Sequence, residues 1–180
     1  RKGATAISEY KQMGILPEAL VNFLLLLGWS PGADREIISS EEAISLFDIK
    51  HVNKTAAVLD MDKLFWINGE YLKHKDPALL LDMLLPLLAD KGLVDPQHFD
   101  RNYLLSLIQL LQQRMETLND FVERSDFFFV EEPAMDQAAV AKFLSRDLSR
   151  EFGLFLKRLD ALPAFDVSSL EKAFRDMTTE

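Results

Sequence analysis

Helix start signals recur along the first half of this chain, and apolar residues spaced three and four apart follow each of them. Pro17 suits the first turn of one helix, where its missing N–H has no consequence. Ser39 and Glu42 have the spacing of a capping box, which predicts a second helix. Asp60 can cap a third helix, which we expect to end at the pair Asn68-Gly69.

The second half of the chain keeps the same helical period. Asp76-Pro77 is a helix start, and Pro86 within the following apolar run should kink or divide that helix. Ser168 and Glu171 offer a second capping box. The apolar spacing predicts helices over residues 99–123, 135–162 and 166–177, and a loop or short strand over 126–132. The pattern as a whole predicts an all-α fold.

Composition limits the classes of protein that this chain can belong to. With 180 residues, 48% of them hydrophobic, it can form one substantial core or two small ones. It has no cysteine, and its three histidines have no metal-ligand spacing, so we expect no metal site. The longest apolar run is far shorter than the roughly 20 residues of a membrane span. We therefore expect a cytoplasmic protein with no membrane contact.

Motifs of catalysis are not found. The sequence contains no Ser-His-Asp order with a nucleophile elbow, no phosphate-binding glycine loop and no HExxH. Paired acids such as Glu41-Glu42 are adjacent, so on a helix they point about 100° apart and do not converge on one atom. We therefore assign no catalytic residue within these 180 residues.

Charge is unevenly distributed along the chain. The net charge is −9, which by itself argues against a nucleic-acid partner. Residues 1–75 carry 9 Lys and Arg against 10 Asp and Glu, a net of −1, whereas residues 76–180 carry 11 against 19, a net of −8. A local positive face is what attracts a polyanion, and the first part of the chain can form one. The shift in charge also marks a boundary near residues 72–78.

Lysines and aromatic residues alternate within the segment before that boundary. Lys54, Lys63, Lys73 and Lys75 are interleaved with Asn53, Trp66, Asn68 and Tyr71. This mixture suits phosphate and ribose contacts with aromatic support. The alternative, lysines that only keep a helical region soluble, is the more frequent situation for exposed lysines, and the pattern alone favours it.

Arg114 presents a similar choice. It follows the apolar row of the helix expected over 99–123, and its guanidinium fork could bind the edge of a guanine or a cytosine base. The alternative is an ordinary salt bridge to Glu116 or Asp120, which is the more common role of such an arginine.

Two long phrases in the first 72 residues give the chain a family resemblance. KQMGILPEALVNFLLLLGWSPG and REIISSEEAISLFDIKHVNKTAAVLDMDKLFWINGEYL closely resemble the region that follows the catalytic domain of bacterial and organellar glutamyl-tRNA synthetases. The opening RKGATAISEY resembles the last residues of that family's second class I signature loop. From residue 76 onward the resemblance is weaker and depends on order, length and phrases such as RMETLNDF.

The resemblance implies three parts. Residues 1–75 would be a helical stem-contact module that touches the inner corner of the tRNA. Residues 76–164 would be a helical bundle, the first subdomain of an anticodon-binding cage, and residues 165–180 would begin a second subdomain. The carboxyl end would then be truncated.

The same resemblance implies roles for individual residues. Lys63, Trp66 and Asn68 would face the tRNA, with Lys63 as the best phosphate contact, and the alternative for Trp66 is a core anchor. From the lysine pattern we add Lys54 to the expected tRNA-binding residues. Arg114 falls where family members that discriminate between tRNAs carry an arginine that contacts the third anticodon base. That base is a cytosine in glutamate tRNAs and a guanine in glutamine tRNAs. Arg1 and Lys2 would be the remnant of the ATP-handling loop.

The expected function is therefore the tRNA-binding, anticodon-recognition portion of a class I glutamate–tRNA ligase. The parent enzyme would use ATP with Mg²⁺, whereas these residues would hold no cofactor and would be inactive without a catalytic domain in cis. We expect a monomer whose partner is the tRNA for glutamate, in the cytoplasm or in an organellar matrix. The alternative is a helical protein-interaction module that docks through FLLLLGW or DFFFVEE and binds no RNA.

Overall fold

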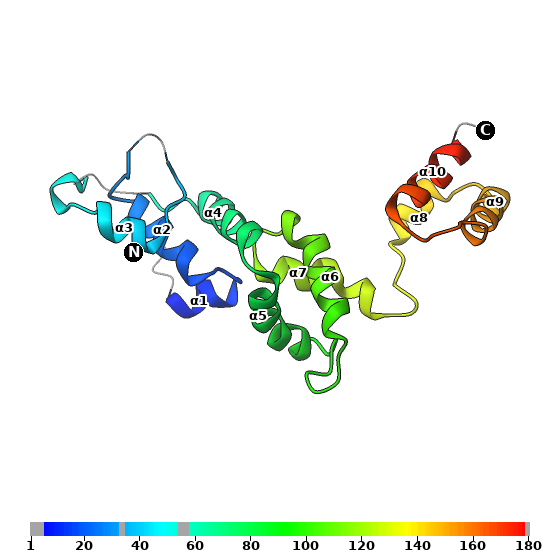
Figure 1. Cartoon of the computed structure of the whole chain (residues 1–180), viewed down its shortest axis with the longest axis horizontal. Coiled ribbons are helices and arrows are strands. Elements are labelled where there is room, and N and C mark those ends of the chain that lie inside the picture. Colours follow the sequence, from blue (N-terminus) through cyan, green and yellow to red (C-terminus); the bar gives the residue numbers. More distant parts are fainter. Residues whose placement is uncertain (1–5, 33–34, 54–57, 179–180) are drawn as a thin grey trace. The chain divides into compact units, whose positions relative to one another are not determined.

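The computed structural model describes residues 6–32, 35–53 and 58–178 (Figure 1). Within these residues the chain forms ten α-helices and three short 3₁₀ turns, with no strand. The all-α prediction is confirmed. No helix in this described part is both long enough and apolar enough to cross a bilayer.

The chain divides into two compact units, residues 1–132 and 133–180. The described helices of the first unit are α1 (Ile7–Gln12), α2 (Pro17–Leu26), α3 (Ser40–Leu46), α4 (Met61–His74), α5 (Pro77–Asp90), α6 (Arg101–Leu111) and α7 (Leu118–Ser125). Its 3₁₀ turns are η1 (Ile49–His51), η2 (Gln112–Arg114) and η3 (Asp126–Phe129). The second unit contains α8 (Gln137–Phe143), α9 (Ser149–Asp160) and α10 (Val167–Thr178).

Side-chain caps fix where several helices begin, as the sequence predicts. Ser39 accepts a hydrogen bond of 3.1 Å from the backbone N–H of Glu42 at the start of α3. Asp60 accepts one of 3.1 Å from Lys63 at the start of α4. An N-terminal cap of this kind satisfies a backbone N–H that has no partner within the helix, and it typically stabilises by about 1 kcal/mol.

One hydrophobic core joins most of the first unit. Leu16, Leu64, Leu84, Ile108 and Phe121 are fully buried in it, and they come from α4, α5, α6, α7 and the segment before α2. A smaller cluster consists of Trp29, Ile38 and Ala43. The larger core contains residues from both sides of position 75, so α4 and α5 are packed into the same unit. The expected division at residues 75 and 164 concerns function and stays a prediction.

Helix α4 does not end at Asn68-Gly69, so that prediction is wrong. The helix continues to His74, and both residues are buried in its middle. Asn68 uses its side-chain amide inside the protein instead of terminating the helix. Gly69 allows the backbone of Met115 and Glu116 to approach closely, since a Cβ built on it would lie 3.2 Å from the Met115 carbonyl oxygen. The pair Asn68-Gly69, which is typical of a turn, therefore serves to pack α4 against residues 115–116.

Other expected boundaries are also corrected. Pro86 lies inside α5, so of the two expected effects, a kink or a division, the division is wrong and the kink stays a prediction. The helix expected over 99–123 is interrupted at residues 112–117, where η2 and the cap of α7 intervene. The region 126–132 begins with the 3₁₀ turn η3. At α10 the cap is Asp166, which accepts from Ser169, and Glu171 instead bonds Arg175 at 2.6 Å.

The second unit is small and partly apolar on its surface. The rings of Phe155 on α9 and Phe174 on α10 meet edge to face with their centroids 6.0 Å apart. Phe152 and Phe174 remain half-exposed. The long segment 135–162, expected as helical, consists of two helices, α8 and α9.

Candidate nucleic-acid interface

The outward face of α4 carries three of the side chains that the sequence singles out. Lys63, Trp66 and Lys73 are spaced by three and seven residues, so they lie along one side of the helix. The buried face of α4, which includes Leu64 and Leu72, packs into the core. Burial of the apolar face therefore decides that these cations and the indole face outward.

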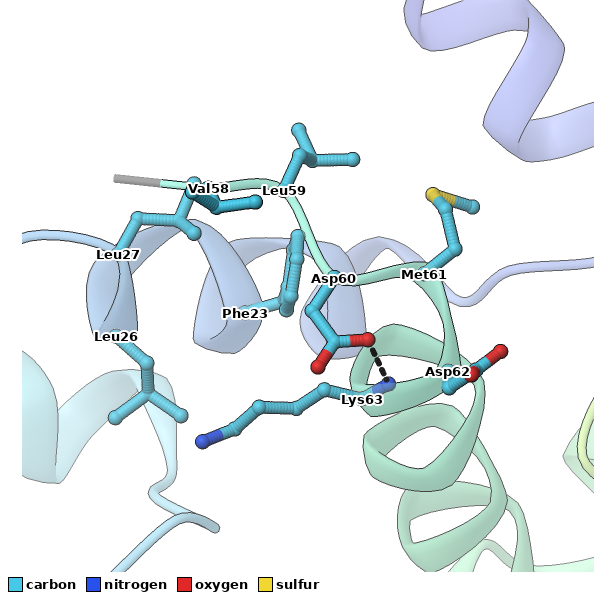
Figure 2. Close-up of a pocket in the computed structure, with 9 residues that line it drawn as sticks. All are labelled: Phe23, Leu26, Leu27, Val58, Leu59, Asp60, Met61, Asp62 and Lys63. Carbon is cyan, nitrogen blue, oxygen red and sulfur yellow. Dashed lines mark hydrogen bonds between the residues drawn. The ribbon is translucent and has the colours of Figure 1, made fainter. Parts of the chain in front are cut away.

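Lys63 lies beside a hollow of about 750 Å³ at the start of α4. Figure 2 shows its side chain extending along the hollow toward Leu26, with Phe23 and Leu59 among the lining residues. The ammonium nitrogen of Lys63 is 2.6 Å from Oε1 of Glu36. Because both side chains are partly exposed, this ion pair contributes only about 0–1 kcal/mol.

Trp66 and Arg114 line one hollow of about 140 Å³. Its other lining residues are Gly69, Lys73, Gln113, Met115 and Glu116. Trp66 is 43% exposed. The structure thus brings together two of the predicted residues that are 48 positions apart in the sequence (114 − 66).

Arg114 is exposed at the last position of η2. The expected alternative, a salt bridge to Glu116 or Asp120, is not found: within residues 6–32, 35–53 and 58–178, Arg114 makes no ion pair. Asp120 is occupied elsewhere, because its carboxylate accepts from the backbone N–H groups of Glu116 and Thr117 at 2.8 and 3.0 Å. The guanidinium fork therefore faces solvent at the edge of the hollow.

The segment that carries Arg114 is held against α4. The side-chain amide of Gln112 donates to the carbonyl oxygens of Leu72 and Lys75 at 2.8 and 2.7 Å, which closes the end of α4. Met115 is buried in the core. These contacts fix the backbone on both sides of Arg114, so the side chain projects from a rigid turn.

Asn68 requires a correction, because it has no surface available to RNA. Its side chain is fully buried, and Oδ1 accepts a hydrogen bond of 2.8 Å from the backbone N–H of Leu16. Nδ2 donates to the carbonyl oxygens of Glu116 and Gly14 at 2.6 and 3.3 Å. The alternation of lysines with polar residues placed Asn68 on the RNA face, but its position in the helix turns it inward.

Tyr71 is likewise used inside the protein. Its hydroxyl donates to the carbonyl oxygen of Ile38 at 2.6 Å and lies 2.9 Å from Oδ1 of Asn22. Burial, with a smaller contribution from the negative charge of Glu18, raises the pKa of Tyr71 above its ordinary value. The residue holds the segment before α3 against α4.

Three of the predicted residues, Lys54, Arg1 and Lys2, lie outside the described residues. Two members of the site were not predicted, Glu36 and Gln113. Nothing in the local pattern marks Glu36, since its partner Lys63 is 27 residues away. Gln113 could have been noticed as the polar neighbour of Arg114.

Comparison with known families shows what this chain is similar to. Residues 79–180 match the family model of an anticodon-binding domain, which is more than half of the chain. Residues 1–66 match the model of the class I tRNA synthetase catalytic domain of the E and Q type. The glutamate–tRNA ligase of Geotalea uraniireducens is 38% identical over all 180 residues. The chain belongs to the family of anticodon-binding domains, and it is similar to glutamate–tRNA ligases over its whole length.

Other glutamate–tRNA ligases agree with this assignment. Glutamate–tRNA ligase 2 of Caldicellulosiruptor saccharolyticus is 38% identical over 97% of the chain. The crystal structure of a glutamate tRNA ligase from Elizabethkingia meningosepticum, in complex with its amino acid, superposes with a TM-score of 0.80. It shares 26% identity and covers 94% of this chain, which corresponds to 33% of that protein. The chain spans 38% and 36% of the length of the two ligases compared by sequence.

Proposed function

We propose that this chain is the tRNA-binding, anticodon-recognition portion of a glutamate–tRNA ligase, the enzyme that attaches glutamate to its tRNA using ATP with Mg²⁺. The observation that carries the proposal is the hollow shared by Trp66 and Arg114. The guanidinium of Arg114 makes no ion pair in the described structure, and the exposed side chain of Trp66 lines the same hollow. An unpaired arginine next to an exposed aromatic ring suits a single-stranded base.

The proposed recognition has two components. Lys63, and Lys73 after exchange of its partner Glu70, would bind backbone phosphates and set the register of the RNA. Arg114 would donate to the edge of the third anticodon base, and Trp66 would face the tRNA beside it. Phosphate contacts supply affinity and the arginine supplies discrimination, so the two can be measured separately.

Catalysis would require a nucleotide-binding domain in cis. The 180 residues by themselves are proposed to bind tRNA as a monomer without charging it, because they contain no catalytic motif. Activity assays with ATP, glutamate and tRNA should therefore detect no product. The cytoplasm, or an organellar matrix, is the proposed compartment.

The functional parts are proposed to follow the order of the chain. Residues 1–75 would contact the stem region of the tRNA, residues 76–164 would form the first anticodon-binding subdomain, and residues 165–180 would begin the second. On this proposal Trp66 comes from the first part and Arg114 from the second, so the hollow lies where the two functions meet.

Binding of transcripts to the purified 180-residue chain tests the proposal. The transcript of a glutamate tRNA should bind at least about tenfold more tightly than a non-cognate tRNA in 50 mM salt, as expected from one good arginine–base contact. Binding of both should weaken in 200 mM salt because phosphate contacts release counterions. Equal affinity for the two transcripts would contradict anticodon recognition.

An alternative function is a helical protein-interaction module. Half-exposed apolar residues such as Leu24 in α2 and Phe127 in η3 come from the two segments that suggest it. The same titration separates the alternatives, because a module of this kind would bind neither transcript.

A further inference from the structure

The buried amide of Asn68 connects three segments that are distant in the sequence. Its Oδ1 accepts from Leu16, and its Nδ2 donates to the carbonyl oxygens of Gly14 and Glu116. The carbonyl oxygen of Gly14 also accepts from the backbone N–H of Leu118 at 3.0 Å. A single side chain therefore links α4 to the turn before α2 and to the segment that follows Arg114.

We propose that Asn68 is a positioning residue for third-base recognition, acting by fixing the backbone on which Arg114 is carried. This inference rests on the proposed function. Arg114 lies between two anchors, Gln112 and Glu116, and both are tied to α4, the helix that carries Trp66. The backbone on both sides of Arg114 is therefore held against the helix that carries Trp66.

The close contact at Gly69 supports the same conclusion. A Cβ on Gly69 would lie 3.2 Å from the Met115 carbonyl oxygen and 3.5 Å from the Glu116 Cα. The backbone of residues 115–116 therefore lies directly on the helix. Movement of Glu116 by a few tenths of an ångström would displace Arg114, which is only two residues away, because base recognition through a guanidinium fork depends on direction.

We expect the hydrogen bonds of Asn68 to affect recognition of the third anticodon base without affecting the affinity that phosphate contacts supply. Asn68 is buried and touches no RNA, so its loss should leave the phosphate contacts of Lys63 in place. Only the orientation of the Arg114 side chain should change. A merely structural role would instead weaken binding of every tRNA to the same degree, through loss of folded protein.

Asn22 provides a matched control. It is also a buried asparagine, on α2, and its amide accepts from the Ile38 N–H and donates to the Glu36 carbonyl oxygen, both at 2.9 Å. Asn22→Ala therefore breaks the same kind of junction as Asn68→Ala. It does so at the segment before α3, and Asn22 makes no hydrogen bond to the residues that surround Arg114.

The experiment measures dissociation constants of the 180-residue chain and its variants for two transcripts. One is a glutamate tRNA with cytosine at the third anticodon position, and the other is the same tRNA with guanine there. The measured ratio is the dissociation constant for the guanine transcript divided by that for the cytosine transcript. In Asn68→Ala we expect this ratio to fall by about threefold or more, because a misplaced directional contact loses part of its discrimination. Affinity for the guanine transcript should change by less than about twofold. Asn22→Ala should preserve the ratio.

Gly69→Ala keeps the test decisive if Asn68→Ala does not fold. Alanine is favourable in a helix by about 1 kcal/mol over glycine, so this variant should remain folded while its methyl group pushes residues 115–116 away. It should also reduce the ratio. A wild-type ratio that persists in every variant that folds would overturn the inference alone. Tight binding by the wild type without any third-base preference would overturn the inference and the anticodon proposal together, and no tRNA binding at all would overturn the proposed function as a whole.

Discussion

The ammonium nitrogen of Lys63 on α4 lies 2.6 Å from a carboxylate oxygen of Glu36, in the segment that leads to α3. The two residues are far apart in the sequence, and the fold alone brings them together. Lys63 is therefore already occupied by an anion before any RNA arrives. If Lys63 binds a backbone phosphate as proposed, that phosphate must replace the carboxylate of Glu36, and we expect the charge of Glu36 to lower tRNA affinity.

Replacing Glu36 by Gln should tighten tRNA binding. Removal of the competing carboxylate frees Lys63 for a phosphate, and we expect about a two- to threefold gain at low salt, consistent with a surface pair worth less than 1 kcal/mol. Lys63→Ala should weaken binding and reduce the slope of log affinity against log salt by about 1. Fluorescence anisotropy over a salt series measures both. Lys91→Ala, an exposed lysine at the end of α5, serves as the control and should leave the affinity unchanged.

Arg114→Ala should reduce discrimination of the third anticodon base by roughly tenfold to a hundredfold, because one good arginine–base contact is worth about 1–3 kcal/mol. The fold should be unaffected, since the side chain is exposed and makes no ion pair in the part of the chain that the structure describes. Arg114→Lys is the matched variant: it keeps the charge but loses the fork. If Arg114→Lys discriminated as well as the wild type, charge and not geometry would be the basis of recognition.

Gly14→Ala should destabilise the first unit strongly. Gly14 has a φ of +79°, and a Cβ there would lie 2.8 Å from the backbone nitrogen of Leu118. Strain and overpacking together should lower the free energy of unfolding by about 2–4 kcal/mol. Gly92→Ala is the control, because Gly92 has a φ of +69° with open space around it and should lose only about 1–2 kcal/mol. Urea denaturation compares the two, and equal losses would show that the contact with Leu118 has no energetic role.

Tyr71→Phe should change how stability depends on pH. Burial raises the pKa of Tyr71 in the folded state, so its contribution is fully present below the ordinary pKa of about 10 and is lost as the pH rises through the folded value. The free energy of unfolding of the wild type should therefore fall more steeply above about pH 10 than that of Tyr71→Phe. At pH 7 the variant should be less stable by about 1 kcal/mol, through loss of the hydrogen bond to Ile38. Parallel curves above pH 10 would contradict this account.

Local chemistry in the sequence predicts much of the fold. Asp60 and Ser39 cap their helices as expected, and Pro17 and Pro77 lie at first helical positions, because caps and proline act within one turn of the chain. The errors have a common origin. Asn68-Gly69 resembles a helix exit, yet tertiary packing uses the amide and the missing side chain within α4.

The candidate site shows the same division. Lys63, Trp66 and Arg114 could be selected from the sequence because residue type and family resemblance mark them. Their relationships could not be predicted: Glu36 pairs with Lys63, and Trp66 shares a hollow with Arg114, only because separate helices pack on one core. The inward position of Asn68 was missed for the same reason.

The sequence by itself determined that this chain is helical, where several of its helices begin, and which family it resembles, because these properties depend on neighbouring residues and on long specific phrases. Only the tertiary structure decided which polar groups face outward and which hold the molecule together. Burial of the apolar face of α4 turns Asn68 into the core and leaves Lys63 and Trp66 outside, and the hydrogen bonds of Asn68 and Gln112 place Arg114 beside that helix.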